Sequence, residues 1–199
     1  MTPRTLAIGL DGCSWNVLEP LLETGRLPNL AALRSRSAWG VLESTVPFYT
    51  GPAWASFATG ASPGAHGIYD FAMMREGDRM SPASLTDLRR VTYYELLAGE
   101  GKRSVLVNLP LDQDTCEGTV IVNSWLTVDE ARRLVPLDRR DRYRRQLDAY
   151  RNYPTTFDAS LERHVEDLCE LERTRFELAR ELFLQEDWAH YFILFSSPD

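Results

Sequence analysis

The N-terminal part of the chain alternates short apolar runs with stretches of helical periodicity. The short apolar run from Thr5 to Leu10 predicts a strand that ends at Asp11-Gly12. Apolar residues then recur at helical spacing and predict a helix with one apolar face: Trp15, Leu18, Leu21 and Leu22. Pro28 is typical of the first position of a second helix, and a further strand is expected from Ala38 to Glu43.

The rest of the chain repeats this alternation. Two helices and two strands are expected in its middle part: Pro52 to Thr59, Val91 to Ala98, Ser104 to Asn108 and Thr119 to Asn123. Ser160 is expected to cap a long helix that runs to about Gln185. The buried stripe of this helix is predicted to be Leu161, Val165, Leu168, Leu171, Leu178 and Leu182. A last strand is expected from His190 to Phe195.

The order of these elements predicts an α/β fold with a mainly parallel central sheet flanked by helices. In such sheets, ligands bind beyond the carboxyl ends of the strands. Asp11 follows the first strand and Asp199 follows the last, so both are candidate functional residues. Residues 75–90 are polar, and the segment 72–92 is expected to be a loop or insertion in one domain that spans residues 1–199.

Composition and charge argue against several classes of function. The net charge of −7 argues against a nucleic acid polymer as partner, because such binders are normally basic. No apolar run reaches the ~20 residues of a membrane helix, so no membrane association is expected. The three cysteines are widely spaced, which favours a reducing, cytoplasmic location. Residues 132–151 hold eight arginines interleaved with aspartates, which indicates a solvated helix face in preference to an anion-binding patch.

Three residues could carry chemistry. Asp11 precedes a glycine, and its carboxylate could bind a divalent metal or cap the next turn. Thr50 lies just before the helix expected from Pro52, where free backbone N–H groups favour anions. Its hydroxyl could cap the helix, bind a phosphate or act as a metal-activated nucleophile. His66 could be a ligand or a loop histidine bonded to the backbone, and the structural role is favoured.

Five short motifs follow one another in the N-terminal third: Leu6 to Gly12, Gly25 to Leu30, Thr50 to Trp54, Thr59-Gly60 and Pro63 to Ile68. In this order they resemble the type I phosphodiesterase/nucleotide pyrophosphatase family of the alkaline phosphatase superfamily. A weaker likeness continues in Gly101-Lys102 with Val105 to Pro110, and in Asp187-Trp188 before the last strand.

The resemblance implies an alkaline-phosphatase-like sandwich with two divalent metal ions, usually zinc, that bridge a phosphoryl group. Asp11 matches a metal-binding aspartate, and Thr50 matches the nucleophile, which is also a metal ligand. Asp199 matches the first residue of a later Asp-x-x-x-His ligand pair. The implied activity is hydrolysis of phosphodiester, pyrophosphate or phosphomonoester bonds in a small phosphorylated substrate, through a phospho-threonine intermediate.

Two features depart from the family pattern. Ala53 stands where many nucleotide pyrophosphatases have an asparagine that contacts the phosphate. The histidine expected after Asp199 and a later Ser-Asp-His-Gly-type stretch are absent from the 199 residues. We therefore expect the N-terminal part of a catalytic domain, with half an active site in this chain alone.

Two other kinds of function stay open. One is a non-catalytic binding module that keeps the fold without a complete metal site. The other is a different reaction of the superfamily, such as that of the sulfatases or the phosphate mutases. A sulfatase nucleophile is a cysteine or serine in its own maturation motif, which Thr50-Gly-Pro fits poorly.

Overall fold

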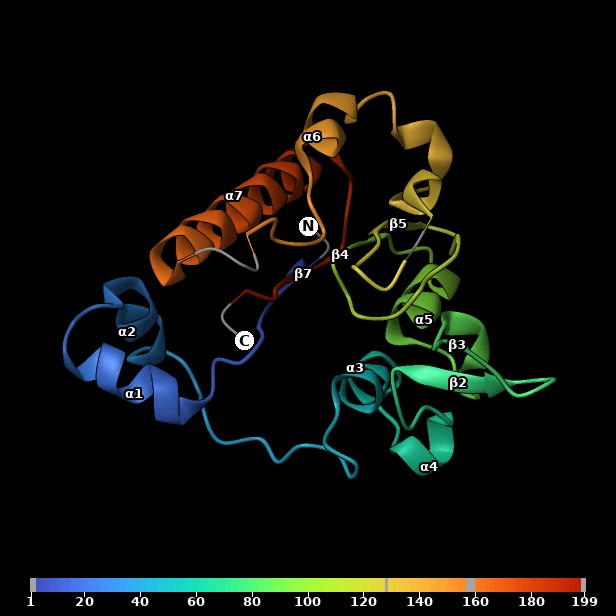
Figure 1. Cartoon of the computed structure of the whole chain (residues 1–199), viewed down its shortest axis with the longest axis horizontal. Coiled ribbons are helices and arrows are strands. Elements are labelled where there is room, and N and C mark those ends of the chain that lie inside the picture. Colours follow the sequence, from blue (N-terminus) through green and yellow to red (C-terminus); the bar gives the residue numbers. More distant parts are fainter. Residues whose placement is uncertain (1–2, 128, 157–159, 198–199) are drawn as a thin grey trace.

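The computed structural model describes residues 3–127, 129–156 and 160–197. A five-stranded sheet with strand order β1-β7-β4-β5-β6 forms its centre (Figure 1). The strands are β1 (Thr5–Leu10), β4 (Ser104–Val107), β5 (Thr119–Val122), β6 (Leu134–Val135) and β7 (His190–Phe195). β1, β7, β4 and β5 pair in parallel, and β6 pairs antiparallel to β5. The architecture confirms the mixed α/β fold with a mainly parallel sheet.

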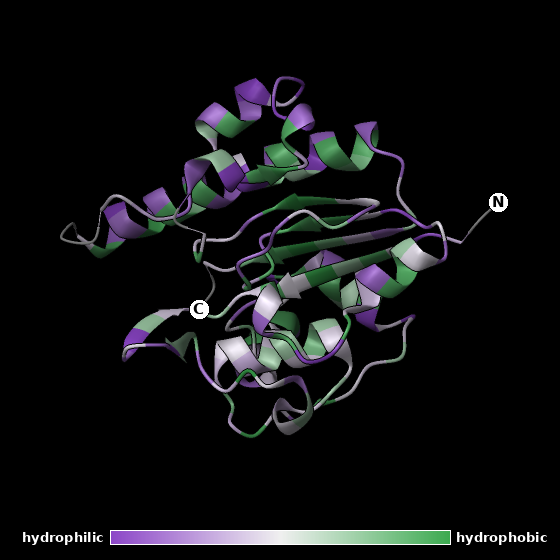
Figure 2. Ribbon diagram, turned by 90° about the vertical axis from the view of Figure 1, so that its right-hand side faces the viewer, coloured by the Kyte–Doolittle hydropathy of each residue, from purple (hydrophilic) through white to green (hydrophobic). Residues whose placement is uncertain are grey.

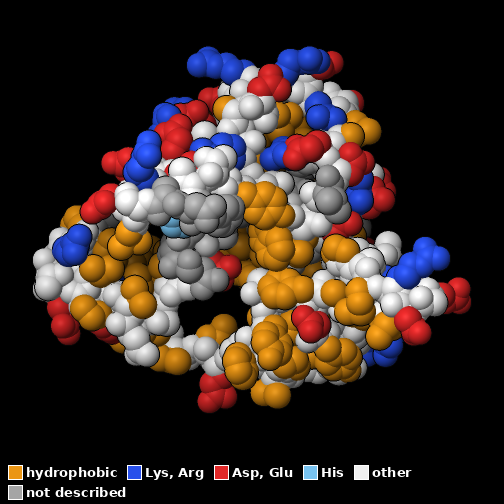
Figure 3. Space-filling model, in the orientation of Figure 1, with side chains coloured by type: hydrophobic (Ala, Val, Ile, Leu, Met, Phe, Trp, Pro, Cys, Tyr) orange, Lys and Arg blue, Asp and Glu red, His pale blue; other side chains and the backbone are white. Residues whose placement is uncertain are grey.

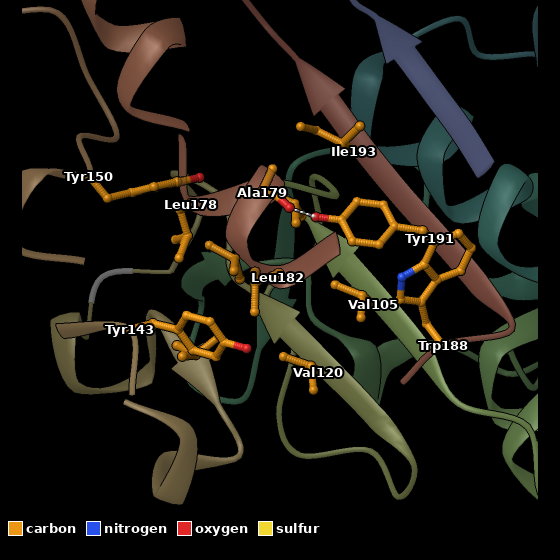
Figure 4. Close-up of a cluster of buried hydrophobic side chains, with 13 residues drawn as sticks. Val105, Val120, Tyr143, Tyr150, Leu178, Ala179, Leu182, Trp188, Tyr191 and Ile193 are labelled. Atoms are coloured by element: carbon orange, nitrogen blue, oxygen red, sulfur yellow. Dashed lines mark hydrogen bonds between the residues drawn. The ribbon is translucent and has the colours of Figure 1, made fainter. Parts of the chain in front are cut away.

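Helices cover both faces of the sheet (Figure 2). α6 (Arg144–Ala149) and α7 (Leu161–Gln185) pack on one face, and α3 (Thr50–Thr59) and α5 (Tyr93–Gly99) pack on the other. The inner strands are buried on both sides, which is why they are continuous apolar runs in the sequence. In the core under α7, the Tyr191 hydroxyl donates a hydrogen bond to the Ala179 carbonyl at 2.5 Å (Figure 4).

Helix α7 matches its predicted length but only part of its predicted buried stripe. Ser160 caps it as expected, because its hydroxyl accepts a hydrogen bond from the Arg163 amide. The predicted residues are buried at Leu171, Leu178 and Leu182. The prediction is wrong for the first turns, where Leu161 is 77% and Val165 is 48% exposed. None of the helices in the described ranges is long and apolar enough to cross a membrane.

The N-terminal helices form a lobe beside the sheet. They are α1 (Trp15–Glu23) and α2 (Pro28–Arg34), and Gly25 between them adopts a positive φ of 69° that favours glycine. Arg34 of α2 pairs with Glu19 of α1 at 2.7 Å and lies 3.7 Å from the centre of the Trp39 ring. These contacts tie both helices to the segment that follows them.

The strand expected from Ala38 to Glu43 is wrong. This segment has no regular secondary structure, and its apolar side chains are largely in solvent, with Val41 80% and Leu42 94% exposed. A strand needs a neighbour for its backbone hydrogen bonds, and no strand of the described ranges pairs with this segment. The apolar pattern is therefore present without the partner that would make it a strand.

For two further segments, the structure adds detail that the sequence did not predict. Residues 72–92, expected to be a loop or insertion, contain a hairpin of β2 (Ala72–Arg75) and β3 (Arg79–Pro82), which is separate from the central sheet. The arginine-rich residues 132–151 form short helical turns, the two-residue strand β6 and α6 in place of one continuous helix face. Two of these arginines, Arg139 and Arg142, lie 3.2 and 3.8 Å from the buried carboxylate of Glu186.

Candidate functional site

The carboxyl ends of β1 and β7 meet at one edge of the sheet. Leu10 is paired with Phe195, and the Asp11 amide donates a hydrogen bond to the Phe195 carbonyl at 2.9 Å. Asp11 is half-buried at this point. The ends of the first and last strands therefore lie side by side at Leu10 and Phe195, whereas Asp199 lies outside the described residues.

Asp11 lies in a sharp turn. Gly12 has a φ of 69°, and the residue before α1 is Ser14, so Asp11 does not occupy the cap position of that helix. Burial and the nearby Asp11 carboxylate both raise the pKa of the Cys13 thiol. A thiol that is held protonated is a poor nucleophile. The candidate functional group in this turn is therefore the Asp11 carboxylate.

Thr50 is the first residue of α3, and the residue at the cap position is Tyr49. The first backbone hydrogen bond of the helix runs from the Ala53 amide to the Tyr49 carbonyl at 3.0 Å. The amides of Thr50 and Gly51 therefore precede the helical bonding pattern, and Pro52 has no N–H. The half-buried Thr50 hydroxyl stands beside these donors, at the end of the helix that favours an anion.

Close backbone packing fixes the start of α3. A Cβ on Gly51 would come within 2.8 Å of the Asp70 carbonyl oxygen, so only glycine fits the observed approach. One turn further, the Trp54 ring meets the Phe192 ring of β7 edge to face with centroids 5.7 Å apart. A Cβ on Gly9 of β1 would lie 3.1 Å from the same indole. These contacts seat the first turns of α3 against the two strands that carry the site.

His66 has a structural role in this arrangement, as the sequence favoured. It is fully buried, its Nδ1 accepts a hydrogen bond from the Ile68 amide at 3.1 Å, and Nε2 lies 2.9 Å from Ser56 Oγ. Because Nδ1 is an acceptor, Nε2 carries the proton and donates to Ser56. The histidine thereby ties α3 to the turn after α4 (Pro63–His66). Burial lowers its pKa, which keeps the ring neutral.

Three polar residues near the strand ends escaped the sequence reasoning. Asn108, directly after β4, has a positive φ of 65°, and its side-chain amide donates to the Leu194 carbonyl of β7 at 3.0 Å. Glu172 and Arg175 of α7 contact Ser196 and Ser197 at the end of β7. The signal for Asn108 is a polar residue that ends a buried run, but periodicity gives no sign that two charged residues of α7 turn inward.

Two of the candidate residues carry oxygen groups of the kind that bind divalent cations. A carboxylate at Asp11 and a hydroxyl at Thr50 are oxygen ligands, and the helix start adds backbone donors for an anion bound to a metal. Within the described ranges, however, no three His, Cys, Asp or Glu side chains gather closely enough to hold an ion. Structural and catalytic zinc sites take about three or more protein ligands, so Asp11 and Thr50 would each supply one ligand of a larger set.

The surface around the site is open. Figure 3 shows a hollow through this face of the molecule, with the α1–α2 lobe on one side and the part that carries α3 on the other. The segment that crosses below it carries exposed apolar side chains, among them Val46 at 88% and Phe48 at 76%. Ala53 lies in the first turn of α3, and it offers no polar group to a bound phosphate.

Comparison with known proteins links this arrangement to one family and one fold. The profile described as type I phosphodiesterase / nucleotide pyrophosphatase matches residues 5–199. Two solved structures of phosphonoacetate hydrolase from Sinorhizobium meliloti 1021 share the fold. The complex with phosphonoacetate has a TM-score of 0.60 and 16% identity, and the complex with phosphonoformate has a TM-score of 0.63 and 19% identity.

The overlap with these structures is unequal. In both comparisons it covers 97% of this chain and 46% of the hydrolase chain, so this chain spans about half the length of the solved chains it matches. A search of curated proteins found no match.

Proposed function

Because this chain belongs to the type I phosphodiesterase / nucleotide pyrophosphatase family, we propose that it contributes to a metal-dependent hydrolase of small phosphorylated substrates. The observation that carries the proposal is the place of Thr50. Its hydroxyl stands at the start of α3, beside backbone amides that precede the helical bonding pattern, on a helix seated against β1 and β7. A nucleophile at this place has donors for the phosphoryl oxygens from the same turn of helix.

The proposed reaction has two steps. The Thr50 oxygen attacks phosphorus and forms a phospho-threonine while the bond to the leaving group breaks. Water then cleaves the phospho-threonine and restores the hydroxyl. The amides of Thr50 and Gly51 are placed to stabilise the negative charge on the phosphoryl oxygens, and the fixed start of α3 holds the attacking oxygen in position.

Asp11, Thr50 and Asp199 are the residues that would hold two divalent ions, for which zinc is the expected metal. When bound, such ions act as Lewis acids that stabilise the attacking and leaving oxygens. Asp11 suits this role because it follows β1 directly and is bonded to the end of β7. Three ligands are too few for two zinc ions, so the proposal requires further ligands from protein that corresponds to the uncovered half of the solved relatives.

The relatives indicate a class of substrate and not an individual compound. The solved hydrolases are complexes with phosphonoacetate and phosphonoformate, which are small phosphonates. A small phosphorylated or phosphonate compound is therefore the proposed substrate of this protein. Because Ala53 offers no amide to the phosphate, we expect its preference to differ from that of nucleotide pyrophosphatases that carry an asparagine there.

A substrate panel tests the proposal. The full-length protein with added Zn²⁺ is assayed on bis-p-nitrophenyl phosphate, p-nitrophenyl phosphate and p-nitrophenyl sulfate. Turnover of either phosphate that a chelator removes supports the proposal and ranks diesterase against monoesterase activity. Preferential turnover of the sulfate would instead favour the sulfatase alternative.

A binding module without catalysis, which keeps the fold without a complete metal site, is the second candidate. Calorimetric titration of the full-length protein with Zn²⁺ separates the two. Tight binding of two ions at neutral pH contradicts the binding module. Absence of zinc binding together with absence of turnover contradicts the hydrolase.

A further inference from the structure

A cavity of about 570 Å³ opens at the amino ends of the parallel strands, on the opposite edge of the sheet from Asp11. The first residues of β1, β4 and β7 are in register there, because Thr5 and Ser104 both pair with His190. This hollow, the basal cavity, has the volume of a small-molecule site. It is lined by residues that precede these strands: Arg4, Gly101, Lys102, Arg103, Asp187, Trp188 and Ala189.

Backbone hydrogen bonds fix the walls of the basal cavity. The Thr5 amide donates to the Ala189 carbonyl at 2.9 Å, and the Ala189 amide donates to the Arg103 carbonyl at 2.8 Å. The sheet thereby brings together two stretches that are distant in the sequence, Gly101-Lys102 and Asp187-Trp188, neither of which takes part in the proposed reaction. Side chains at the starts of paired strands have better-defined positions than side chains of free loops.

The lining of the basal cavity carries more positive than negative charge. Arg4, Lys102 and Arg103 are cationic, and Asp187 is the only carboxylate among these described lining residues. Within the described part of the chain, Lys102 forms no ion pair. The lining therefore has a surplus of two positive charges in a chain whose net charge is −7. A concave surface of one sign concentrates the field that attracts an opposite charge.

The ion pairs with Asp187 are long and exposed. Its carboxylate lies 3.9 Å from the Arg4 guanidinium and 3.4 Å from that of Arg103, and the side chains are 75%, 56% and 63% exposed in that order. Such pairs contribute little to stability, so a stronger anion replaces them readily. The Arg4 guanidinium also lies 4.7 Å from the centre of the Trp188 ring, a contact that leaves its in-plane N–H groups as donors.

We propose that the basal cavity binds a small dianion of the phosphate type, either free phosphate or the phosphate group of a small ester. A guanidinium matches two oxygens of such a group, and the ammonium of Lys102 supplies a further positive charge. The surplus of two positive charges complements a phosphate group, which carries nearly two negative charges at neutral pH. The cavity lies at the amino edge of the sheet, so this inference is independent of the proposed function at the carboxyl edge.

Protection of the Lys102 amine tests the proposal. Lys102 is the only lysine of the 199 residues, and peptide mass spectrometry follows its acetylation in the full-length protein. A chelator is present, so that no metal takes part. Millimolar inorganic phosphate is expected to slow acetylation about fivefold or more, because a bound dianion covers the amine and keeps it protonated. Sodium chloride at the same ionic strength should change the rate by less than about twofold.

Two substitutions are expected to change this protection in opposite directions. Arg103→Gln removes a guanidinium and should raise the phosphate concentration for half-protection about tenfold. Asp187→Asn removes the competing carboxylate and should lower that concentration about threefold. The matched control is Arg26→Gln, since Arg26 is an exposed arginine between α1 and α2 that does not line the basal cavity. Circular dichroism of each variant checks that the fold is kept.

Several results would overturn the proposal. They are equal protection by phosphate and chloride, equal behaviour of Arg103→Gln and Arg26→Gln, and protection by a single-stranded oligonucleotide without protection by phosphate. Glycerol 2-phosphate is tested beside inorganic phosphate, and the stronger protector shows whether the preferred group is esterified or free. A failure of turnover or of zinc binding contradicts the hydrolase but leaves the protection of Lys102 unchanged, so the two proposals fail separately.

Discussion

At the scale of single residues, Thr50 is distinguished by its backbone position. Tyr49 occupies the cap position of α3, and the Tyr49 side chain forms no capping hydrogen bond. Thr50 is the first residue with helical geometry. Its hydroxyl takes part in none of the hydrogen bonds found among the described residues, whereas Thr92, at the start of α5, forms a reciprocal capping box. The Thr92 hydroxyl thus caps a helix, whereas the Thr50 hydroxyl has no capping role at the start of α3.

Replacement of Thr50 by alanine is therefore expected to remove activity without loss of the fold. Thr50→Ala should lower kcat on the preferred aryl phosphate by roughly 10³-fold or more, because the attacking oxygen is gone. Circular dichroism should be unchanged, since the lost hydroxyl caps nothing. Thr50→Ser keeps the oxygen and should retain measurable turnover. Loss of the folded signal in Thr50→Ala would instead assign the threonine a structural role.

His66 gives the stability a predictable pH dependence. Because burial lowers its pKa in the folded state, the unfolded chain binds more protons between the folded pKa and the ordinary value of about 6.5. The free energy of unfolding should thus be highest above about pH 6.5 and fall as the pH is lowered below it. His190, whose pKa is also lowered by burial, contributes in the same direction.

Urea unfolding between pH 5 and pH 8 checks the contribution of His66. In His66→Gln the group that titrates is gone, so the decline of unfolding free energy toward pH 5 should become shallower, with the part due to His190 left. An identical pH slope in the two proteins would contradict the role of His66 as a buried neutral histidine.

At the scale of elements, α7 shows how far periodicity can be trusted. Leucines recur along the whole helix, but only those opposite the sheet meet partners, so Leu178 and Leu182 are fully buried while Leu161 is 77% exposed. The inward face also carries Arg175, which is 2% exposed and satisfied by backbone carbonyls. The polar residue is inside and the apolar one outside because the helix extends past the core that it covers.

A pair of leucine substitutions in α7 measures this difference. Leu178→Ala opens a cavity between the helix and the sheet and should cost about 2–5 kcal/mol of unfolding free energy. Leu161→Ala, the matched control in the same helix, should change it by no more than about 0.5 kcal/mol. Chemical denaturation at neutral pH gives both values. Equal losses for the two variants would show that the first turn of α7 is buried in solution.

At the scale of the whole molecule, apolar surface is left uncovered along one side. β1 is an edge strand, and its outward residues Leu6, Ile8 and Leu10 are 42–57% exposed. Leu6 and Ile8 line an apolar groove of about 370 Å³ together with residues of α7 such as Phe176 and Phe183. An unpaired strand edge beside an apolar groove is a template for association.

The 199-residue chain is therefore expected to self-associate through the β1 edge. Ile8→Lys places a charge in the groove and should shift the sedimentation profile toward the monomer, because edge charges oppose strand pairing. Leu96→Lys is the control, since Leu96 is similarly exposed at 60% but lies on α5, away from the groove. Equal effects of the two substitutions, or a monomeric unmodified chain, would contradict the expectation.

The sequence alone determined most of the fold. The apolar runs at β4, β5 and β7 are short and bounded by turn residues, and a parallel sheet buried on both faces needs such runs. The run at β1 is similar, although this edge strand is more exposed. Their alternation with helices implied the parallel order, and the ordered motifs around Asp11 and Thr50 pointed to the family whose profile matches the chain. Local patterns suffice here because the periodicity within each segment indicates a helix or a strand, and because each motif is contiguous in the sequence.

Only the tertiary structure decided what depends on partners distant in the chain. It showed that the segment from Ala38 to Glu43 lacks a neighbouring strand, and it turned Arg175 inward. It also joined Asp11 to the end of β7 and clamped the following turn through Glu172. A periodicity records which residues are apolar, but hydrogen bonding and burial are relations between two segments, so they are settled only when both segments are in place.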